Sequence, residues 1–436
     1  MSQLLPFDTD PLIDDRIRGF PPGHAPLPLS AIGGRGWRPE GGTMALPLLS
    51  LDRTAFDGNV ALMMRAVREA GAAIAPHAKT PMSPELARRL VEAGAWGTTV
   101  ADIRQASVML KAGLKRLILA NEIGGAAAAR RLAALLAGHP DAELHIFVDS
   151  VELVRHLAEV WAARDDLPSL GLLVELGLGR AGLRTPEAAE KVLAAALAAE
   201  TPRLRVSGTG AYEGAAATAD AAQTRARIDA LMAATAAFHQ SLRARVGLER
   251  PLILTAGGSV FFDLVLSGLR EVLAGDPATR LVLRSGAIFF HDHGIYERGM
   301  VALDARAGLV VDGKPVSVAQ GFRPALRVWA EILSVPEPGL AIAGMGLRDV
   351  AIDQGLPTPL RSFRDGALTP GAEGASVLRL NDQHAFLAIG EGRDIRPGDV
   401  VEFGLSHPCT CLDRHAILYE LGEDGTVAGA LALRFG

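Results

Sequence analysis

The sequence predicts an α/β protein with two folded parts, a closed (β/α)8 barrel of the TIM type and a C-terminal, mostly-β domain. Two observations carry this prediction. From residue 73 to residue 284, eight short apolar runs alternate with Ala-rich amphipathic segments, the pattern of parallel strands separated by helices. After residue 300 the apolar runs are broken by Gly and Pro, and helical repeats become rare, which indicates β structure. An open, doubly wound sheet is the alternative for the first part.

The chain divides into three segments by composition. Residues 1–45 are rich in Pro and Gly, and we interpret them as an extended arm that lies over another part of the protein or across a dimer partner. Residues 46–300 are assigned to the barrel, which begins with a strand at 46–50 and a helix that Asp52 can cap. Residues 301–436 are assigned to the mostly-β domain.

Each barrel strand except the last is expected to lead into a helix, and the longest helical run covers residues 219–244. The expected barrel strands are 73–76, 97–100, 117–120, 143–148, 170–176, 204–208, 252–256 and 281–284. The expected strands of the second domain are 308–311, 327–335, 376–380, 385–388 and 416–421.

The composition excludes several classes of protein. The net charge is -5 and basic runs are missing, which argues against nucleic acid as a partner, because phosphate binding needs clustered Lys and Arg. No uninterrupted apolar run is long enough to span a membrane, and the first residues lack the apolar region of a signal peptide. With only two cysteines, two residues apart, a disulfide framework is excluded and a cytoplasmic location is expected.

Lys79 is the most unusual residue of the predicted barrel. The chain has only five lysines, and Lys79 follows the first strand in the run Pro-His-Ala-Lys-Thr, directly before a helical pattern. Barrel enzymes keep reactive groups at such strand-to-helix turns. A buried lysine loses its proton readily because desolvation disfavours the ammonium, and the neutral amine can form a Schiff base. A lysine that snorkels from a strand end is the alternative.

Other unusual residues follow later strands and are therefore expected at the same end of the barrel. Arg180 follows the fifth strand and Tyr212 the sixth, although an ion pair between Arg180 and Glu175 is an equally simple interpretation. Two small-residue loops follow the last two strands, where backbone N–H groups can bind a phosphate. These loops contain Gly257, Gly258 and Ser259, and Ser285, Gly286 and Ala287. One Gly-Gly-Ser run is by itself more often a turn.

A reactive lysine and a phosphate site across one barrel mouth indicate pyridoxal 5'-phosphate as the cofactor. In that case Arg180 can hold the ring oxygen of the cofactor and Tyr212 can contact the ring face or nitrogen. This combination is more specific than any of its parts.

A second group of candidate residues lies near the C-terminus, in Ser-His-Pro-Cys-Thr-Cys. If this segment is extended, His407 and Cys409 face the same way and can bind one ion, and Cys411 shares that face. Imidazole and thiolate suit Zn²⁺. A packed thiol pair and a cysteine nucleophile paired with histidine are the alternatives.

Taken together, six motifs resemble the D-serine dehydratase and D-threonine aldolase family, whose members are pyridoxal-phosphate enzymes of the alanine-racemase fold (fold type III). The resemblance covers most of the chain after residue 45. Within the family, the chain most resembles bacterial proteins labelled amino acid deaminase or D-serine deaminase-like. The motifs are Pro-His-Ala-Lys-Thr at 76–80, Gly-Leu-Gly-Arg-Ala-Gly at 177–182, Ala-Tyr-Glu-Gly at 211–214, Gly-Gly-Ser at 257–259, Leu-Arg-Ser-Gly at 283–286 and Ser-His-Pro-Cys at 406–409.

The resemblance implies a role for each candidate residue. Lys79 is implied as the Schiff-base lysine, with His77 beside it as a second catalytic residue, and the two loops as the phosphate site. His407 and Cys409 match the metal pair, which is His-x-Cys in the dehydratases and tends to be His-x-Asp in the aldolases. Many relatives have a lysine where this chain has Met82 and an aromatic residue where it has Ile288.

The expected activity is therefore a metal-assisted dehydration of a D-3-hydroxy amino acid such as D-serine, which yields a 2-keto acid and ammonia. Lys79 is expected to take the α-proton, and a divalent metal, most simply Zn²⁺, to help the β-hydroxyl leave. The alternatives are a D-threonine aldolase, an amino acid racemase and a non-catalytic cofactor-binding protein. A homodimer is expected by analogy of fold.

Overall fold

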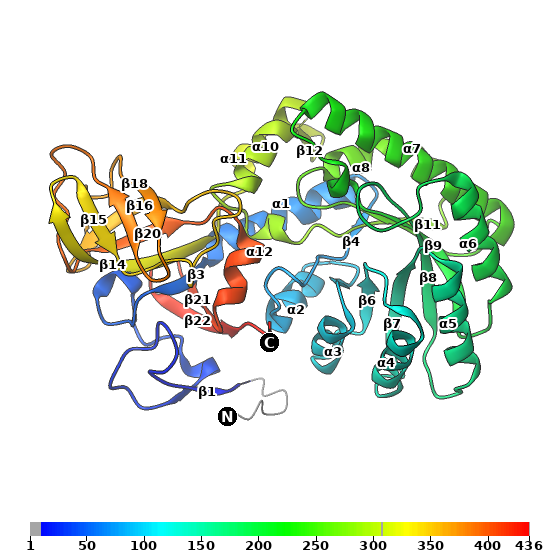
Figure 1. Cartoon of the computed structure of the whole chain (residues 1–436), viewed down its shortest axis with the longest axis horizontal. Helices are drawn as coiled ribbons and strands as arrows, with labels where there is room; N and C mark the ends of the chain where they lie inside the picture. The colour runs from blue at the N-terminus through cyan, green and yellow to red at the C-terminus, as the bar shows by residue number, and fades with distance from the viewer. Residues whose placement is uncertain (1–9, 307, 436) are drawn as a thin grey trace.

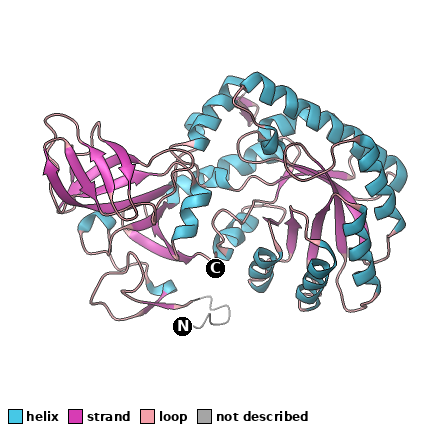
Figure 2. Ribbon diagram, in the orientation of Figure 1, coloured by secondary structure: helices cyan, strands magenta, loops and turns pink. Residues whose placement is uncertain are grey.

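The structure, a computed structural model, describes residues 10–306 and 308–435. Figure 1 shows two bodies side by side, a set of strands flanked by helices and a separate β domain. Figure 2 shows that most helices surround the barrel, whereas the β domain is built largely of strands. Within the described residues, no helix has the length and apolar character needed to cross a membrane.

The first body is a parallel eight-stranded sheet in the order β4-β11-β10-β9-β8-β7-β6-β5. The ring closes between the ends of this sheet, where Trp96 N–H donates to Ile74 O at 2.7 Å and Thr99 N–H to Pro76 O at 3.0 Å. The predicted closed barrel is thus confirmed, and the open sheet is excluded. Its strands are β4 (Ala73–Ile74), β5 (Thr98–Val100), β6 (Arg116–Leu119), β7 (Glu143–Val148), β8 (Leu170–Leu176), β9 (Leu204–Ala211), β10 (Leu252–Ala256) and β11 (Thr279–Leu283).

Helices follow the barrel strands and cover the outside of the ring. Several begin at a polar side chain that accepts a hydrogen bond from the first turn, as Ser83, Asp102, Ser150 and Asp220 do. The helices are α2 (Pro84–Glu92), α3 (Ile103–Lys111), α4 (Gly125–Ala137), α5 (Val151–Ala162), α6 (Pro186–Ala198), α7 (Ala221–Val246), α8 (Phe262–Gly268), α9 (Arg270–Gly275) and α10 (Ile295–Arg306).

The β domain is organised around one sheet in the order β17-β16-β20-β14-β15-β19-β18, and β3, β21 and β22 extend it at the side of β14. Its strands are β3 (Leu48–Asp52), β14 (Leu326–Glu337), β15 (Leu340–Ala343), β16 (Thr358–Arg364), β17 (Ala367–Thr369), β18 (Ser376–Leu380), β19 (Ala385–Ala388), β20 (Val400–Gly404), β21 (Ile417–Leu421) and β22 (Val427–Ala432). The short helix α12 (Pro408–Cys411) follows β20 and lies beside the barrel (Figure 1).

Two strands lie elsewhere than the sequence suggested. The strand β3, which was counted with the barrel in the range 46–300, pairs with β14 and β21 of the β domain. The strand β12 (Leu309–Val311) forms a small hairpin with β13 (Lys314–Val316), and this hairpin packs against the helix α1 (Arg53–Glu69) rather than joining the large sheet. Both placements depend on distant pairing partners, which local periodicity does not reveal.

The described part of the N-terminal arm packs on the β domain of its own chain. A short pairing of β1 (Leu12–Ile13) with β2 (Leu27–Pro28) shapes it. Phe20 and Trp37 join a buried cluster with Trp329 and Tyr419, and the Tyr419 hydroxyl donates to Arg18 O at 3.0 Å. The arm therefore covers one face of the β domain, one of the two positions predicted for it. Residues 1–9 lie outside the described part of the chain.

Candidate active site

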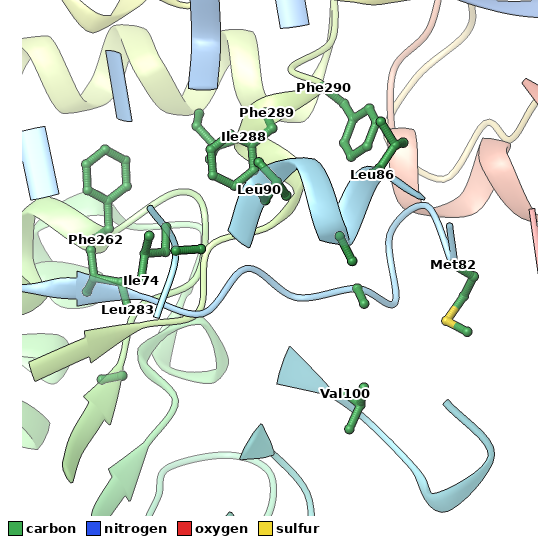
Figure 3. Close-up of a cluster of buried hydrophobic side chains, with 14 of the residues drawn as sticks. Ile74, Met82, Leu86, Leu90, Val100, Phe262, Leu283, Ile288, Phe289 and Phe290 are labelled. Carbon is green, nitrogen blue, oxygen red and sulfur yellow. The ribbon is translucent and has the colours of Figure 1, made fainter. Parts of the chain in front are cut away.

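Lys79 lies in the turn between β4 and α2, at the carboxyl end of the first barrel strand. Buried apolar side chains pack around this turn, and Figure 3 shows Ile74, Leu86, Leu90 and Phe290 among them. Residue Lys79 is solvent-exposed, so the expectation of a buried lysine is wrong in that respect. The protein around it nevertheless lowers its pKa, first by desolvation and then through Arg180 and Arg284, against an opposing effect of Cys409.

His77 lies two residues earlier and is enclosed by the same turn. Its Nδ1 accepts a weak hydrogen bond from the Lys79 N–H at 3.4 Å. Burial, Lys79 and Arg284 hold the pKa of His77 well below its usual value, so the ring is neutral near pH 7. A neutral imidazole adds no further positive charge to a site that already contains three cationic side chains.

The predicted ring-binding residues come together on neighbouring strand ends. The guanidinium of Arg180 lies 4.6 Å from the centroid of the Tyr212 ring, in cation–π geometry. Burial raises the pKa of the Tyr212 hydroxyl, which therefore stays protonated. An ion pair between Arg180 and Glu175, the alternative from sequence, is not among the ion pairs of residues 10–306 and 308–435.

The glycine loop after β10 differs from the prediction. We expected the N–H groups of Gly257 and Gly258 to be available to a phosphate, but both donate to the carboxylate of Glu213, at 3.0 and 2.5 Å. A buried carboxylate needs donors of its own, and these two N–H groups are the nearest. Ser259 remains free of this carboxylate, and its Oγ accepts from Ile288 N–H at 3.2 Å.

The loop after β11 has the properties of an anion site. Gly286 lies so close to the preceding turn that an added Cβ would be 2.5 Å from the carbonyl oxygen of His77. No side chain caps the short helix η4 (Ala287–Phe289), and within the described residues no acceptor binds the buried N–H groups of Gly286 and Ala287. Buried N–H groups without a protein partner fit a bound phosphate. The loop and Lys79 together therefore fit pyridoxal phosphate.

His407 and Cys409 reach the barrel mouth from the β domain of the same chain. The expected extended segment is wrong, because His407 is the N-cap of the helix α12 and Cys409 lies in its first turn. The two side chains still lie near each other, since Cys409 raises the pKa of His407 against the effect of burial. Cys409 Sγ lies 3.2 Å from the hydroxyl oxygen of Thr80, the residue after Lys79. This contact places the His-Cys pair beside the candidate catalytic lysine.

The surroundings of His407 fit a metal ligand. Its Nδ1 lies 2.6 Å from Asp353 Oδ2, and the other oxygen of Asp353 accepts from the Thr410 hydroxyl at 2.8 Å. A carboxylate on Nδ1 fixes the ring and leaves Nε2 as the coordinating atom, the usual arrangement of metal-bound histidine. Within residues 10–306 and 308–435, no three His, Cys, Asp or Glu side chains form a preformed metal cluster, so the protein offers a two-residue site.

Cys411 does not share this site. Its side chain is fully buried, its sulfur accepts from Ala351 N–H at 3.3 Å, and burial raises its thiol pKa to about 12. The expectation that it could be a third ligand rested on an extended backbone, and helical geometry turns it away from Cys409. Cys411 is a core residue of the β domain.

Several residues at the site were not predicted. Arg284 is buried and donates to Thr255 Oγ1 at 2.8 Å and Ala211 O at 2.7 Å. Tyr296 lies at the start of α10, and burial together with Cys409 raises the pKa of its hydroxyl. An arginine directly after an apolar strand signals Arg284 in the sequence, whereas no local pattern reveals Tyr296 or Asp353.

A pair of carboxyl groups lies at the same mouth, at the ends of two strands that flank β7. Glu122 follows β6, and Glu175 is in β8. Both oxygens of Glu122 and one of Glu175 are buried without a donor from the described residues. Burial and the carboxyl of Glu175 raise the pKa of Glu122 to about 9. At neutral pH one proton therefore lies between the two groups.

The two departures from the family pattern are packing residues in this chain. Met82 and Ile288 are both fully buried and belong to the core cluster shown in Figure 3. Neither side chain is exposed to a substrate. The lysine and the aromatic residue of the relatives have no counterpart at these positions.

Two family models match the chain, one in each body. The model "Alanine racemase, N-terminal domain" matches residues 51–249, and the model "Putative serine dehydratase domain" matches residues 325–421. The chain is 26% identical over 353 residues to 3-hydroxy-D-aspartate aldolase of Paracoccus denitrificans. The matched stretch covers 79% of this chain and 81% of that protein. It is 25% identical over 350 residues to D-threonine aldolase of an Arthrobacter species, with 79% and 80% covered.

Solved structures share the same fold. The D-threonine aldolase from Filomicrobium marinum superposes with a TM-score of 0.71 at 24% identity, over 90% of this chain and 95% of that one. The D-threo-3-hydroxyaspartate dehydratase from Delftia sp. HT23 superposes with a TM-score of 0.68 at 19% identity, over 91% and 99%. The fold is thus alanine-racemase-like, with a mostly-β second domain.

Proposed function

We propose that this chain, which matches an alanine racemase N-terminal model over residues 51–249 and a serine dehydratase-type model over residues 325–421, is a pyridoxal-phosphate- and metal-dependent dehydratase of D-3-hydroxy amino acids such as D-serine. The contact between Thr80 and Cys409 carries this proposal. It brings a lysine with a lowered pKa and a His-Cys pair to one barrel mouth, which are the two chemistries that elimination of a β-hydroxyl needs.

Each residue has a defined task in this proposal. Lys79 would hold the cofactor, Arg180 and Tyr212 would orient its ring, and His407 and Cys409 would hold a divalent metal, most simply Zn²⁺. When bound, the cofactor supplies an electron sink for charge at Cα and the metal supplies a Lewis acid for the β-hydroxyl. Lys79 Nζ, whose pKa the site lowers, can accept the Cα proton once it has lost its own.

The net reaction is balanced by water. Loss of the Cα proton and the Cβ hydroxyl removes one water and leaves an enamine. Addition of water to the tautomeric imine then releases ammonia and a 2-keto acid. For D-serine the products are pyruvate and ammonia.

The identity of the second metal-site residue favours dehydration over cleavage. D-threo-3-hydroxyaspartate dehydratase has been solved with a histidine replaced and, in a metal-free form, with a cysteine two positions later replaced. This spacing equals that of His407 and Cys409. The resemblance associates His-x-Cys with dehydratases and His-x-Asp with aldolases. An aldolase that releases glycine and an aldehyde is the second candidate, because both curated relatives described above are aldolases.

Product analysis tests the proposal. Protein loaded with pyridoxal phosphate and Zn²⁺ is given D-serine, D-threonine or D-3-hydroxyaspartate, each with and without a chelator. Ammonia without glycine, lost on chelation, is expected. Glycine with an aldehyde would move the assignment to aldolase, and neither product would contradict both.

The variant Lys79→Ala is expected to release no ammonia above background, because both the cofactor bond and the proton acceptor at Cα are removed. Lys191→Ala, in helix α6, is the matched control and should keep wild-type turnover. Ammonia release by Lys79→Ala at the wild-type rate would contradict the assigned role of this lysine.

A further inference from the structure

Glu213 is a completely buried carboxylate at the mouth of the barrel. It follows Tyr212 in the short helix η3 (Glu213–Ala216). Its Oε2 accepts from Gly257 N–H at 3.0 Å and its Oε1 from Gly258 N–H at 2.5 Å. One carboxylate thus bridges two consecutive backbone N–H groups of the glycine loop.

Burying the charged carboxylate is unfavourable, so neighbouring groups must stabilise its charge. The two backbone donors stabilise the carboxylate directly. The buried guanidinium of Arg284 is also near, since Glu213 raises the pKa of Arg284 while burial lowers it. The glycine loop also lies close to both groups, since an added Cβ on Gly258 would be 3.2 Å from Glu213 and 3.3 Å from the Tyr212 ring. Glu213 therefore holds the glycine loop beside the Tyr212 ring.

Hydrogen bonds extend from this bridge to the second loop. The Ser285 hydroxyl donates to Gly258 O at 2.8 Å. Ser259 Oγ accepts from Ile288 N–H at 3.2 Å. These and a further bond from Arg284 N–H to Gly257 O link the loop that Glu213 holds to the segment of Gly286 and Ala287, whose N–H groups have no acceptor among the described residues.

We propose that Glu213 is a positioning residue for the phosphate end of the cofactor site. By occupying the N–H groups of Gly257 and Gly258 it assigns the phosphate to Ser259, Gly286 and Ala287, and it holds these three groups in register. This inference rests on pyridoxal phosphate being the cofactor. It also predicts that Glu213 acts on the phosphate and not on the pyridine ring.

A comparison of pyridoxal phosphate with pyridoxal, which lacks the phosphate, tests this inference. Both ligands are titrated into cofactor-free protein that carries Lys79→Ala, so that bond formation to the lysine does not contribute, and binding is followed by protein fluorescence. The variants are Glu213→Gln and Ser259→Ala. The control is Glu402→Gln, which alters an equally buried carboxylate in β20 of the other domain.

Glu213→Gln is expected to reduce the preference for pyridoxal phosphate over pyridoxal about tenfold, because an amide can accept only one of the two N–H groups cleanly. The affinity for pyridoxal should stay within about twofold, since ring contacts are unchanged. Ser259→Ala should reduce the same preference, and Glu402→Gln should leave it as it is. The rise in melting temperature that inorganic phosphate causes should become smaller in the same variants that lose the preference for pyridoxal phosphate.

Three outcomes would overturn the inference. An equal loss of both ligands in Glu213→Gln would make Glu213 a general structural residue. An increased phosphate preference would show that the phosphate itself uses the Gly257 and Gly258 N–H groups. If Glu213→Gln does not fold, the Ser259→Ala variant decides. An unchanged preference of this variant for pyridoxal phosphate over pyridoxal would contradict the assignment of the phosphate to Ser259. Absence of pyridoxal phosphate binding by the chain with Lys79 intact would instead reject the proposed cofactor.

Discussion

At the scale of single residues, the functional side chains of the site are held in place by contacts with neighbouring residues. His407 is oriented by Asp353, Cys409 contacts Thr80, and Arg180 stacks on Tyr212. Such supporting contacts restrict the rotamers of the functional groups and so reduce the entropy that is lost when a ligand binds.

Asp353→Asn should weaken metal retention about 10-fold to 100-fold, because the amide cannot hold the His407 ring as the carboxylate does. Metal content after dialysis against a graded chelator series measures this. Asp382→Asn, an exposed aspartate elsewhere in the β domain, is the control. Equal retention in both variants would show that Asp353 does not support the metal site.

Gly286→Ala should destabilise the protein by about 1–3 kcal/mol, because its Cβ would meet backbone atoms of His77 that cannot move aside. Denaturant unfolding measures the difference. Gly138→Ala, at the C-cap of α4, is the control, since its nearest contact is an ordinary 3.5 Å. A Gly286 variant as stable as the control would contradict the close approach of the two loops.

At the scale of elements, the parallel strands bring chemical groups together because all their carboxyl ends lie at one mouth. Lys79 follows β4, Glu175 lies in β8, Tyr212 follows β9 and Arg284 follows β11. Residues far apart in the sequence are therefore close in space, although no local sequence pattern indicates it. The same geometry forces the carboxyl groups of Glu122 and Glu175 together.

This pair predicts a pH-dependent stability. The folded-state pKa of Glu122 is raised from 4.5 to about 9, so its contribution to stability is fully present below about pH 4.5 and is lost as the pH rises towards 9. Glu122→Gln removes the titrating group, and its amide can donate to Glu175. The variant should therefore gain stability relative to wild type from about pH 5 to about pH 8.

Urea unfolding at several pH values measures this difference. Asp149 also faces the pair, but it is present in both proteins and affects both curves. Glu92→Gln, an exposed glutamate of α2, is the control and should follow the wild-type curve. Parallel curves for wild type and Glu122→Gln would reject the shared proton.

At the scale of the whole molecule, the site forms where the two bodies meet. The barrel provides Lys79 and the phosphate loops, and the β domain provides the His-Cys pair through α12, within one chain. The arm covers the β domain on another face. The predicted homodimer stays a prediction, and light scattering of the purified protein would measure it.

Phe20→Ala should destabilise the protein by about 3–5 kcal/mol, because this arm residue is fully buried against the β domain. Leu12→Ala, at a site that is 71% exposed, should have little effect. Denaturant unfolding of both variants compares them. A small loss for Phe20→Ala would mean that the arm packs only loosely.

The sequence by itself determined the barrel strands, the position of Lys79 at a strand end and the spacing of the His-Cys pair. Each of these is encoded locally, by apolar periodicity and by residue type. Only the tertiary structure decided which strands pair over long distances, such as β3 with β14, and which donors remain free. Glu213 and the Gly257–Gly258 loop show the reason. A buried carboxylate takes the nearest N–H groups, and which groups are nearest depends on the packing of segments far apart in the chain.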